Sequence, residues 1–152
     1  MNQIKTFIIT LTMLGIVGAG PVFAGDTSVN TVGVNGYDLV TYQTDKRPLR
    51  GNGNYVSVHD SITYLFANEQ NKAAFEKNPN KYLPTYGGWC AYGVAIGKKF
   101  SADPEVWDIV DGRLYLNLDN GIKKIWSEDI PGNIKKADKH WVNIKDKSPE
   151  HL

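Results

Sequence analysis

Two short stretches of the chain, residues 55–58 and 61–66, are dominated by β-branched and aromatic side chains. This composition is typical of strands, because such side chains pack well on a pleated, half-buried surface. The next segment carries helix-forming residues after Asn68, a residue type that commonly caps helix N-termini. It stops at Asn78-Pro79, because proline disfavours the helical conformation of the residue before it. The pattern predicts strand, strand and helix in succession.

Further along the chain, apolar and polar positions alternate on both sides of Asp111-Gly112, over residues 106–110 and 113–118. Asp-Gly is favoured in the two-residue type I′ turn, whose two central residues both have positive φ. A hairpin with this turn brings two apolar pairs onto one face, Ile109 opposite Leu114 and Trp107 opposite Leu116. Its other face carries Asp108, Arg113, Tyr115 and Asn117. We expect an antiparallel hairpin over 106–118.

In the C-terminal part the apolar positions recur with the helical period. One set is Ile122, Ile125 and Trp126, and a second set is Ile134, Ala137 and Trp141. Lys135, Lys136 and Lys139 lie off the second apolar stripe, where a solvated face is expected. The spacing predicts two amphipathic helices.

These elements indicate a small single domain of the α+β class. Its short antiparallel strands include the 106–118 hairpin, and two to four short helices accompany them. The chain shows no internal repeat and no long linker. We place the domain at residues 35–145, between a loose N-terminal segment, 25–34, and a C-terminal tail, 146–152.

The first residues have the pattern of a secretory leader. Residues 6–20 carry no charge, and Val22 and Ala24 stand at positions −3 and −1 of a signal peptidase site. This apolar run of about 15 residues is shorter than the roughly 20 that a membrane span requires. We expect residues 1–24 to be cleaved, leaving a periplasmic or secreted protein without a membrane attachment.

Cleavage changes the composition in two ways. Loss of Lys5 reduces the 17 basic residues to 16, equal to the 16 acidic ones. A chain without net positive charge lacks the electrostatic footprint of a nucleic-acid binder, so we expect no nucleic-acid partner. Loss of Met1 and Met13 leaves no thioether, so a soft-metal site would depend on Cys90 and the three histidines.

Cys90 is the only cysteine, so no intramolecular disulfide can form in a chain expected in an oxidising compartment. A single cysteine in an exported protein is a buried structural residue, a reactive or metal-binding thiol, or half of an intermolecular disulfide. The sequence leaves these uses open.

Four segments carry a combination of residues that is specific in its order. They are Gly36-Tyr37-Asp38, residues 64–68 followed by Asn71, Phe75, Pro79 and Tyr82, residues 86–91, and residues 112–117. In this combination the chain resembles the exported YHS-domain proteins of bacteria, over about residues 35–141. The resemblance implies a small α+β domain related to TRASH-like and treble-clef metal-binding modules, some of which handle copper or zinc.

In those relatives the strand–helix junction supplies cysteines, or a serine and a histidine, as metal ligands. The corresponding junction here, residues 66–71, contains neither thiol nor imidazole and has Asn68 and Asn71 instead. The remaining candidate ligands are Cys90, His59 and His140, since His151 is the penultimate residue. A symmetric homodimer could alternatively hold a soft ion such as Cu(I) between two Cys90 thiolates.

The first hypothesis is therefore a non-catalytic exported protein that binds a metal, copper first and zinc second, around Cys90. The alternative is a metal-free module that binds a small ligand or a protein, with Cys90 buried and structural. Five aromatic residues near the cysteine could line such a ligand pocket: Tyr37, Tyr82, Tyr86, Trp89 and Tyr92. A third interpretation is a redox or cysteine enzyme, with His59 as base and Asp60 as its orienting group.

Overall fold

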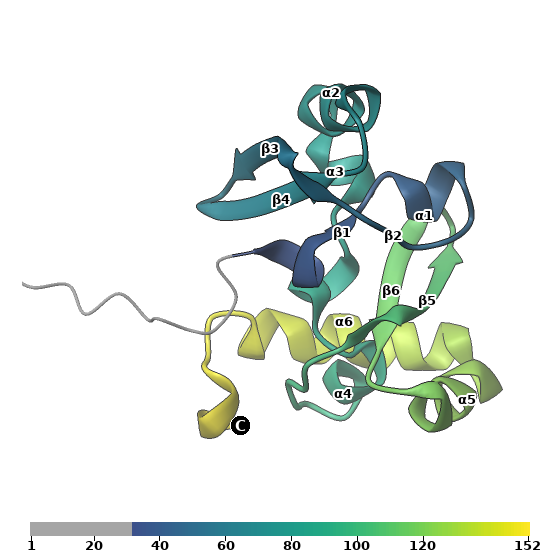
Figure 1. Cartoon of the computed structure of the whole chain (residues 1–152). Coiled ribbons are helices and arrows are strands. Elements are labelled where there is room, and N and C mark those ends of the chain that lie inside the picture. The colour runs from purple at the N-terminus through teal and green to yellow at the C-terminus, as the bar shows by residue number, and fades with distance from the viewer. Residues whose placement is uncertain (1–31) are drawn as a thin grey trace, which may run out of the picture.

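Residues 32–152 are described by a computed structural model, in which helices and two-stranded antiparallel sheets alternate along the chain (Figure 1). The α+β class with short antiparallel strands, predicted from the pattern, is confirmed. The predicted signal peptide and most of the predicted loose segment lie outside the described residues. Within residues 32–152, no helix is long and apolar enough to cross a membrane.

The first half of the described chain forms the upper part of Figure 1. Its elements are the 3-10 helix η1 (Gly33–Gly36), β1 (Tyr37–Asp38), α1 (Thr41–Thr44), β2 (Leu49–Arg50), β3 (Asn52–His59), β4 (Ile62–Phe66), α2 (Glu69–Lys77) and α3 (Pro79–Tyr82). β1 pairs with β2, and β3 with β4.

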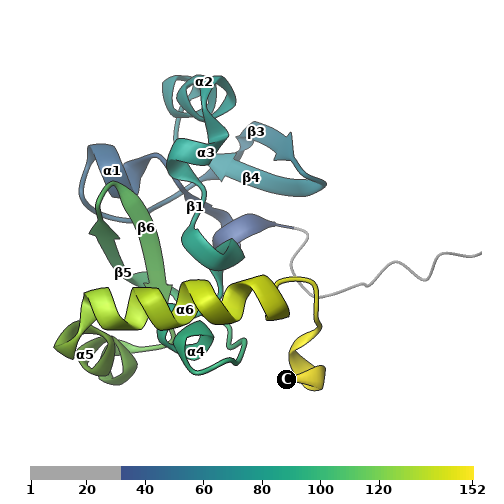
Figure 2. The same ribbon diagram turned by 180° about the vertical axis from the view of Figure 1, so that it is seen from behind.

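The second half forms the lower part, where α6 runs past α4 in the view from behind (Figure 2). Its elements are the 3-10 helix η2 (Thr85–Gly88), α4 (Ala91–Ala95), β5 (Asp103–Val110), β6 (Arg113–Asn117), α5 (Asn120–Glu128), α6 (Ile130–Ile144) and the 3-10 helix η3 (Pro149–His151). The helices longer than two turns are α2, α5 and α6, and each was expected; the additional α1, α3 and α4 are too short to show a periodic pattern.

The predicted strand–strand–helix unit is confirmed. β3 and β4 are antiparallel neighbours, joined at Asp60 and Ser61, which both have positive φ. The side chain of Asn68 accepts a hydrogen bond from the backbone N–H of Asn71 at 2.8 Å, so it caps α2 as expected. The helix ends at Lys77, before Asn78-Pro79.

The predicted hairpin is also confirmed, with Ile109 opposite Leu114 and Trp107 opposite Leu116. Its second face differs from an ordinary solvated face, since Tyr115 and Asn117 are buried. The reason is that α4 and α5 pack against β6 on that side. β6 is therefore covered on both faces and separates two hydrophobic cores.

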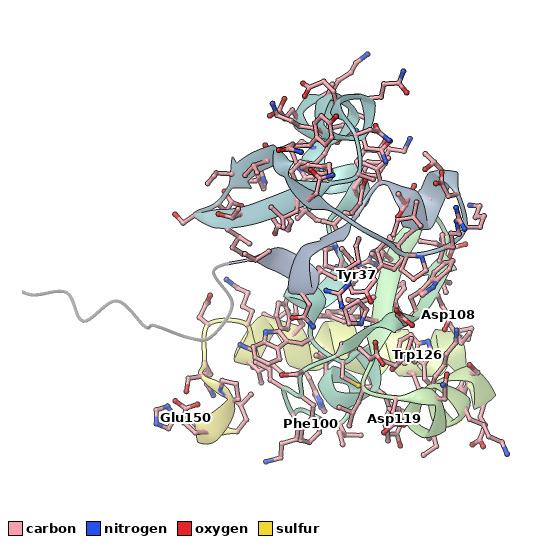
Figure 3. All side chains as sticks on the ribbon, viewed as in Figure 1. Tyr37, Phe100, Asp108, Asp119, Trp126 and Glu150 are labelled. Carbon is pink, nitrogen blue, oxygen red and sulfur yellow. The ribbon has the colours of Figure 1, made fainter. Side chains whose placement is uncertain are left out.

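Alternate residues of β6 belong to different cores. Leu114 and Leu116 pack in the first, whose other members include Leu39, Tyr42, Phe66 and Phe75. Tyr115 packs in the second, with Tyr86, Val94, Trp126 and Ala137. Trp126, labelled in Figure 3, is fully buried. Truncating such a side chain to alanine typically costs about 3–5 kcal/mol, so the second core contributes strongly to stability.

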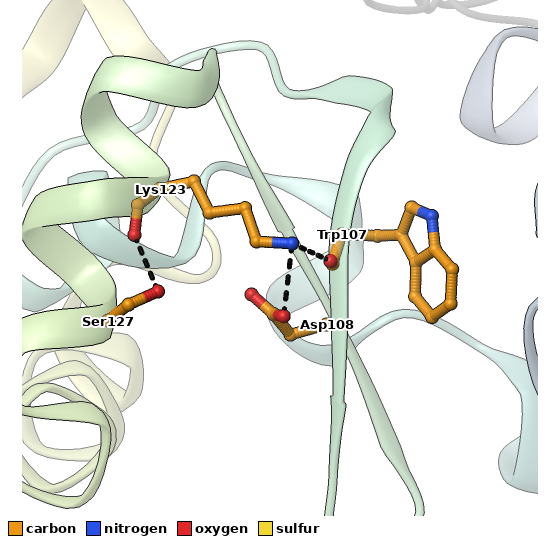
Figure 4. A network of polar contacts seen from close by, with 4 residues as sticks. All are labelled: Trp107, Asp108, Lys123 and Ser127. Atoms are coloured by element: carbon orange, nitrogen blue, oxygen red, sulfur yellow. Dashed lines mark hydrogen bonds and ion pairs between the residues drawn. The ribbon is translucent and has the colours of Figure 1, made fainter.

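Polar contacts orient the two C-terminal helices. Asp119 caps α5 and Asp129 caps α6. The ammonium of Lys123 on α5 donates to the carbonyl of Trp107 and lies 3.1 Å from a carboxylate oxygen of Asp108, which attaches α5 to β5 (Figure 4). On α6, Ala137 is buried while Lys135, Lys136 and Lys139 are exposed, as the stripe predicted.

Both ends of the described chain extend the domain beyond the boundaries placed from the sequence. Val32 forms a bridge with Thr63, and Val34 packs against the first core. At the other end Leu152 packs against the second core. Tertiary contacts of this kind have no local sequence pattern, so the boundaries at 35 and 145 could not anticipate them.

Candidate functional site

Cys90 lies in the interior, immediately before α4, and is 1% exposed. Its sulfur accepts a hydrogen bond from the backbone N–H of Gly93 at 3.4 Å and so caps α4. The thiol also lies 3.7 Å from the side-chain oxygen of Asn117, which accepts from the backbone N–H of Tyr92 as well. Two motif segments, around Cys90 and Asn117, thus meet through these contacts.

Burial raises the pKa of the Cys90 thiol above its ordinary value. The backbone N–H groups of Gly93, Leu118 and Tyr92 act in the opposite direction, but the effect of burial is larger. A thiol that is neutral and sealed from solvent is a poor nucleophile and a poor metal ligand, since both roles require the thiolate. In this environment Cys90 behaves as a small apolar side chain with a weak S–H donor.

The predicted metal ligands do not converge. His59 lies in β3, with its ring against Phe75 and its Nε2 3.5 Å from a carboxylate oxygen of Asp60. His140 lies on α6 against Gly97, beyond the C-terminal end of α4, whereas Cys90 is at the N-terminal end. Among residues 32–152, no group of three or more histidine, cysteine, aspartate or glutamate side chains could hold a metal ion. This part of the chain therefore holds no preformed copper or zinc centre, and metal binding around Cys90 stays a prediction.

The strand–helix junction, residues 66–71, has a structural role. Asp38 is fully buried, and its carboxylate accepts from the side-chain amide of Asn71 at 2.7 Å. The same carboxylate accepts from the backbone N–H groups of Ala67 and Val40, each at 2.9 Å. A buried carboxylate needs such donors, and these three connect β1 to the start of α2. This explains why Gly36-Tyr37-Asp38 and Asn71 occur together.

The five aromatic residues of the predicted pocket lie in different places. Tyr37 and Tyr82 are buried in the first core, and Tyr86 is buried in the second. Tyr92 and Trp89 are partly buried against the second core, and of the five only Trp89 lines the cleft described below. The hydroxyl of Tyr86 donates to the carboxylate of Asp138 at 2.8 Å, so this side chain anchors η2 to α6.

An open cleft of about 1170 Å³ lies next to Trp89. Three segments form its walls: η1 with the turn between β3 and β4, η2 with the loop that precedes β5, and residues 145–150 near the C-terminus. Phe100 and Glu150, both labelled in Figure 3, belong to the second and third walls. His59 and Asp60 line the first wall, whereas Cys90 is not among the lining residues.

Two left-handed turns face this cleft. Val34 and Asn35 in η1 have φ of 47° and 50°, and Tyr86 in η2 has φ of 59°. For residues other than glycine such backbone is strained by about 1–3 kcal/mol each, and strain of this kind concentrates at functional sites. Gly88 has φ of 84°, while a Cβ there would meet nothing closer than 3.5 Å. Conformation, rather than lack of space, therefore favours glycine at this position.

Lys99 lines the cleft and is only 8% exposed. Its ammonium donates to the backbone carbonyls of Lys145 at 2.8 Å and Lys147 at 2.6 Å, just past the end of α6. The ammonium also lies 5.6 Å from the ring centre of Trp89 and 5.4 Å from that of Trp141. Burial lowers the pKa of Lys99, and nearby Asp146 opposes this shift. Lys99 thus holds the third wall of the cleft in place.

Comparison with protein-family models, with curated proteins and with solved structures finds no match for this chain. The resemblance to YHS-domain proteins accordingly stays a prediction based on the motif residues.

Sequence reasoning singled out three residues that line the cleft, Trp89, His59 and Asp60, and missed Lys99, Phe100 and the C-terminal segment. Lys98-Lys99 reads as an ordinary solvated pair, and nothing local distinguishes the buried lysine from the exposed one. The two tryptophans that flank Lys99 are far apart in sequence, so only the fold brings them together.

Proposed function

We propose that this protein is an exported, non-catalytic binding domain of the YHS type that takes a small molecule in the cleft. Cys90 serves the fold rather than the function. The observation that carries this proposal is the contrast in access: the cleft offers Trp89, Phe100 and Lys99 to a ligand, whereas the thiol is sealed among core residues.

The lining of the cleft supports small-molecule binding. Ligand pockets combine apolar or aromatic walls with a few polar groups, and at about 1170 Å³ this cleft is somewhat larger than the usual 300–1,000 Å³. Phe100 is 44% exposed and Ile62 is 37% exposed, and both line the cleft. Large apolar side chains that stay exposed on walls of one cleft favour burial by a ligand, at about 25 cal/mol per Å² of apolar surface removed from water.

Neither the position nor the pKa of the Cys90 thiol supports a catalytic role. His59 and Asp60 border the cleft, but Cys90 does not, so the nucleophile and base of a cysteine enzyme are separated. A catalytic thiol also needs a lowered pKa, whereas burial raises the pKa of Cys90.

A fragment titration followed by two-dimensional amide NMR tests the proposal. Neutral, cationic and anionic fragments are added to the folded mature chain, and we expect shifts to concentrate at Gly87, Gly88, Trp89 and Ser101. Phe100→Ala should weaken the binding, because this side chain lines the cleft.

Ile96→Ala is the matched control, because Ile96 is also exposed, at 52%, yet does not line the cleft. It should leave fragment binding unchanged. Shifts that stay below detection for every fragment, or an equal loss in both variants, would remove the basis of the proposal.

A further inference from the structure

Resting on the proposed function, we infer that the cleft selects a small molecule that carries a carboxylate on an apolar body, and that Lys99 binds the carboxylate. The inference depends on the burial of one charge, on its unfilled hydrogen-bonding capacity and on the aromatic side chains beside it.

Lys99 has hydrogen-bonding capacity to spare. An ammonium group has three N–H donors, and two of them serve the carbonyls of Lys145 and Lys147. Within residues 32–152 no third acceptor binds this ammonium, and no carboxylate lies within ion-pair distance of it. The carbonyl dipoles at the end of α6 favour the cation, but they carry no full negative charge. Lys99 therefore lines the cleft as a buried cation without a carboxylate in direct contact, and Asp146 favours its charge only from beyond ion-pair distance.

The other charged side chains that line the cleft are exposed to solvent. Asp60 and Asp146 have side chains that are 86% and 83% exposed, and each has a partner, His59 and the ammonium of Lys145 respectively. Lys147 and Glu150 are exposed as well. In water a pair of charges 4 Å apart interacts by about 1 kcal/mol, against about 4 kcal/mol at the effective dielectric near a protein surface. Among the charged side chains described as lining the cleft, that of Lys99 is buried. Its positive charge therefore favours a negatively charged ligand.

The surroundings of Lys99 favour an apolar body on the ligand. Trp89 bounds the cleft on the side of the ammonium, and Phe100 follows Lys99 directly in the chain. Trp89 and Ser101 form a bridge, which holds the two aromatic residues on one wall. A ring or branched chain attached to the carboxylate could pack against these side chains.

The donor set suits a singly charged group better than a phosphate. The cleft has one buried cation and no arginine among its lining residues. Phosphate sites usually present several convergent donors, such as an arginine fork or a helix N-terminus. The first free N–H groups of the adjacent helix, α4, are directed to the sulfur of Cys90 and the side chain of Asn117.

The test compares carboxylates with their uncharged amides. Phenylacetate, indole-3-acetate and 4-methylpentanoate are each titrated beside the corresponding primary amide, with the dissociation constant taken from the amide shifts of Trp89 and Ser101. We expect at least one acid to bind roughly tenfold or more tightly than its amide, which corresponds to about 1.4 kcal/mol. Lys99→Met should abolish this preference, whereas Lys98→Met, which removes the neighbouring exposed charge, should preserve it.

Each outcome of these titrations either supports or refutes the inference. If acids bind no better than amides, while neutral or cationic fragments still bind in the cleft, the inference is wrong and the proposed function stands. If no fragment of any class binds, both fail. The comparison in the wild-type protein needs no variant, so it remains decisive even if Lys99→Met does not fold; Lys99→Gln then serves as the second substitution.

Discussion

Cys90 and Lys99 lie on either side of α4, and both side chains are buried, but burial has a different meaning for each. A neutral thiol is inexpensive to bury and packs as a small apolar group. An ammonium loses several kcal/mol of hydration when it leaves water, so it stays buried only where other groups compensate. Burial of Cys90 is explained by the fold, whereas burial of Lys99 beside an open cleft is the observation on which the proposed binding role rests.

Cys90 and Lys99 also illustrate that the rarest residue type in a chain is not necessarily the best candidate for binding a ligand. Cys90 attracts a chemical hypothesis because it is the only cysteine, yet its contacts are those of a helix cap in a core. Lys99 is one of several lysines and attracts none, yet it is the one whose ammonium lies between two tryptophan rings.

The largest expected effect is a loss of folding stability at alkaline pH, caused by the tyrosines buried in the two cores. Burial raises the pKa of Tyr42, Tyr86 and Tyr115 above 10.0 and that of Tyr64 to about 12. The resulting stability is fully present below pH 10 and is lost as pH rises through the folded-state pKa values, because only the unfolded chain ionises there. The three groups with large shifts, Tyr42, Tyr64 and Tyr86, correspond to a loss of up to about 4 kcal/mol per pH unit once the pH exceeds 10, which is a large share of the whole stability of a small domain.

Urea unfolding between pH 8 and pH 11.5, with tyrosinate absorbance recorded in parallel, checks this expectation. Lys99, whose pKa is lowered, acts in the opposite direction, but it is one group against several, since the pKa values of Tyr37 and Cys90 are raised as well. Buried tyrosines that ionise near pH 10 while the chain stays folded would show that the cores are not closed.

A smaller effect is expected from Asn117→Ala. The substitution leaves the backbone N–H of Tyr92 and the thiol of Cys90 without their acceptor and opens a cavity beneath α4, which should cost about 2–3 kcal/mol. Asn80→Ala on the exposed side of α3 is the control and should stay within about 0.5 kcal/mol. The urea midpoints of the two variants measure both effects. Equal midpoints for Asn117→Ala and Asn80→Ala would contradict a structural role for the contacts between Asn117 and the N-terminal end of α4.

Cys90→Ala should cost about 1–2 kcal/mol, because it removes one sulfur atom from a packed site and leaves the backbone N–H of Gly93 without its cap. In the wild-type protein a thiol reagent should react roughly a hundredfold or more slowly with the folded chain than with the urea-unfolded chain, because reaction requires local opening. Ellman's assay checks this rate. Fast reaction in the folded state would place Cys90 at a functional surface.

The smallest change in stability is expected at the other side of α4. Lys99→Met loses two hydrogen bonds but also removes a buried charge, so the net change should stay within about 1 kcal/mol. Hydrogen exchange of the amides of His151 and Leu152 should nevertheless accelerate, because Lys99 no longer holds the segment that precedes them. Lys98→Met should leave this exchange unchanged; acceleration in both variants would argue against a specific attachment.

The sequence predicted those parts of the fold that depend on local signals. Asp111-Gly112 determined the register of β5 and β6, and Asn68 with Pro79 determined both ends of α2. It could not predict that β6 is covered on both faces, because the helices that cover its second face, α4 and α5, are brought there by the fold and not by any local pattern. At the site it predicted Trp89 and His59 but not Lys99, because burial of a lysine depends on contacts with residues about 46 positions away.

Copper binding at Cys90, within one chain or between two chains of a dimer, stays a prediction that opposes the central claim, and one titration decides between them. Cu(I) is added to the folded mature wild type and to Cys90→Ser in competition with a chromogenic chelator, at protein concentrations that allow a dimer to form. The account predicts the same weak binding in both proteins, because Cys90 is sealed and neutral. Stoichiometric binding in the wild type, one ion per chain or per pair of chains, that disappears in Cys90→Ser would contradict it.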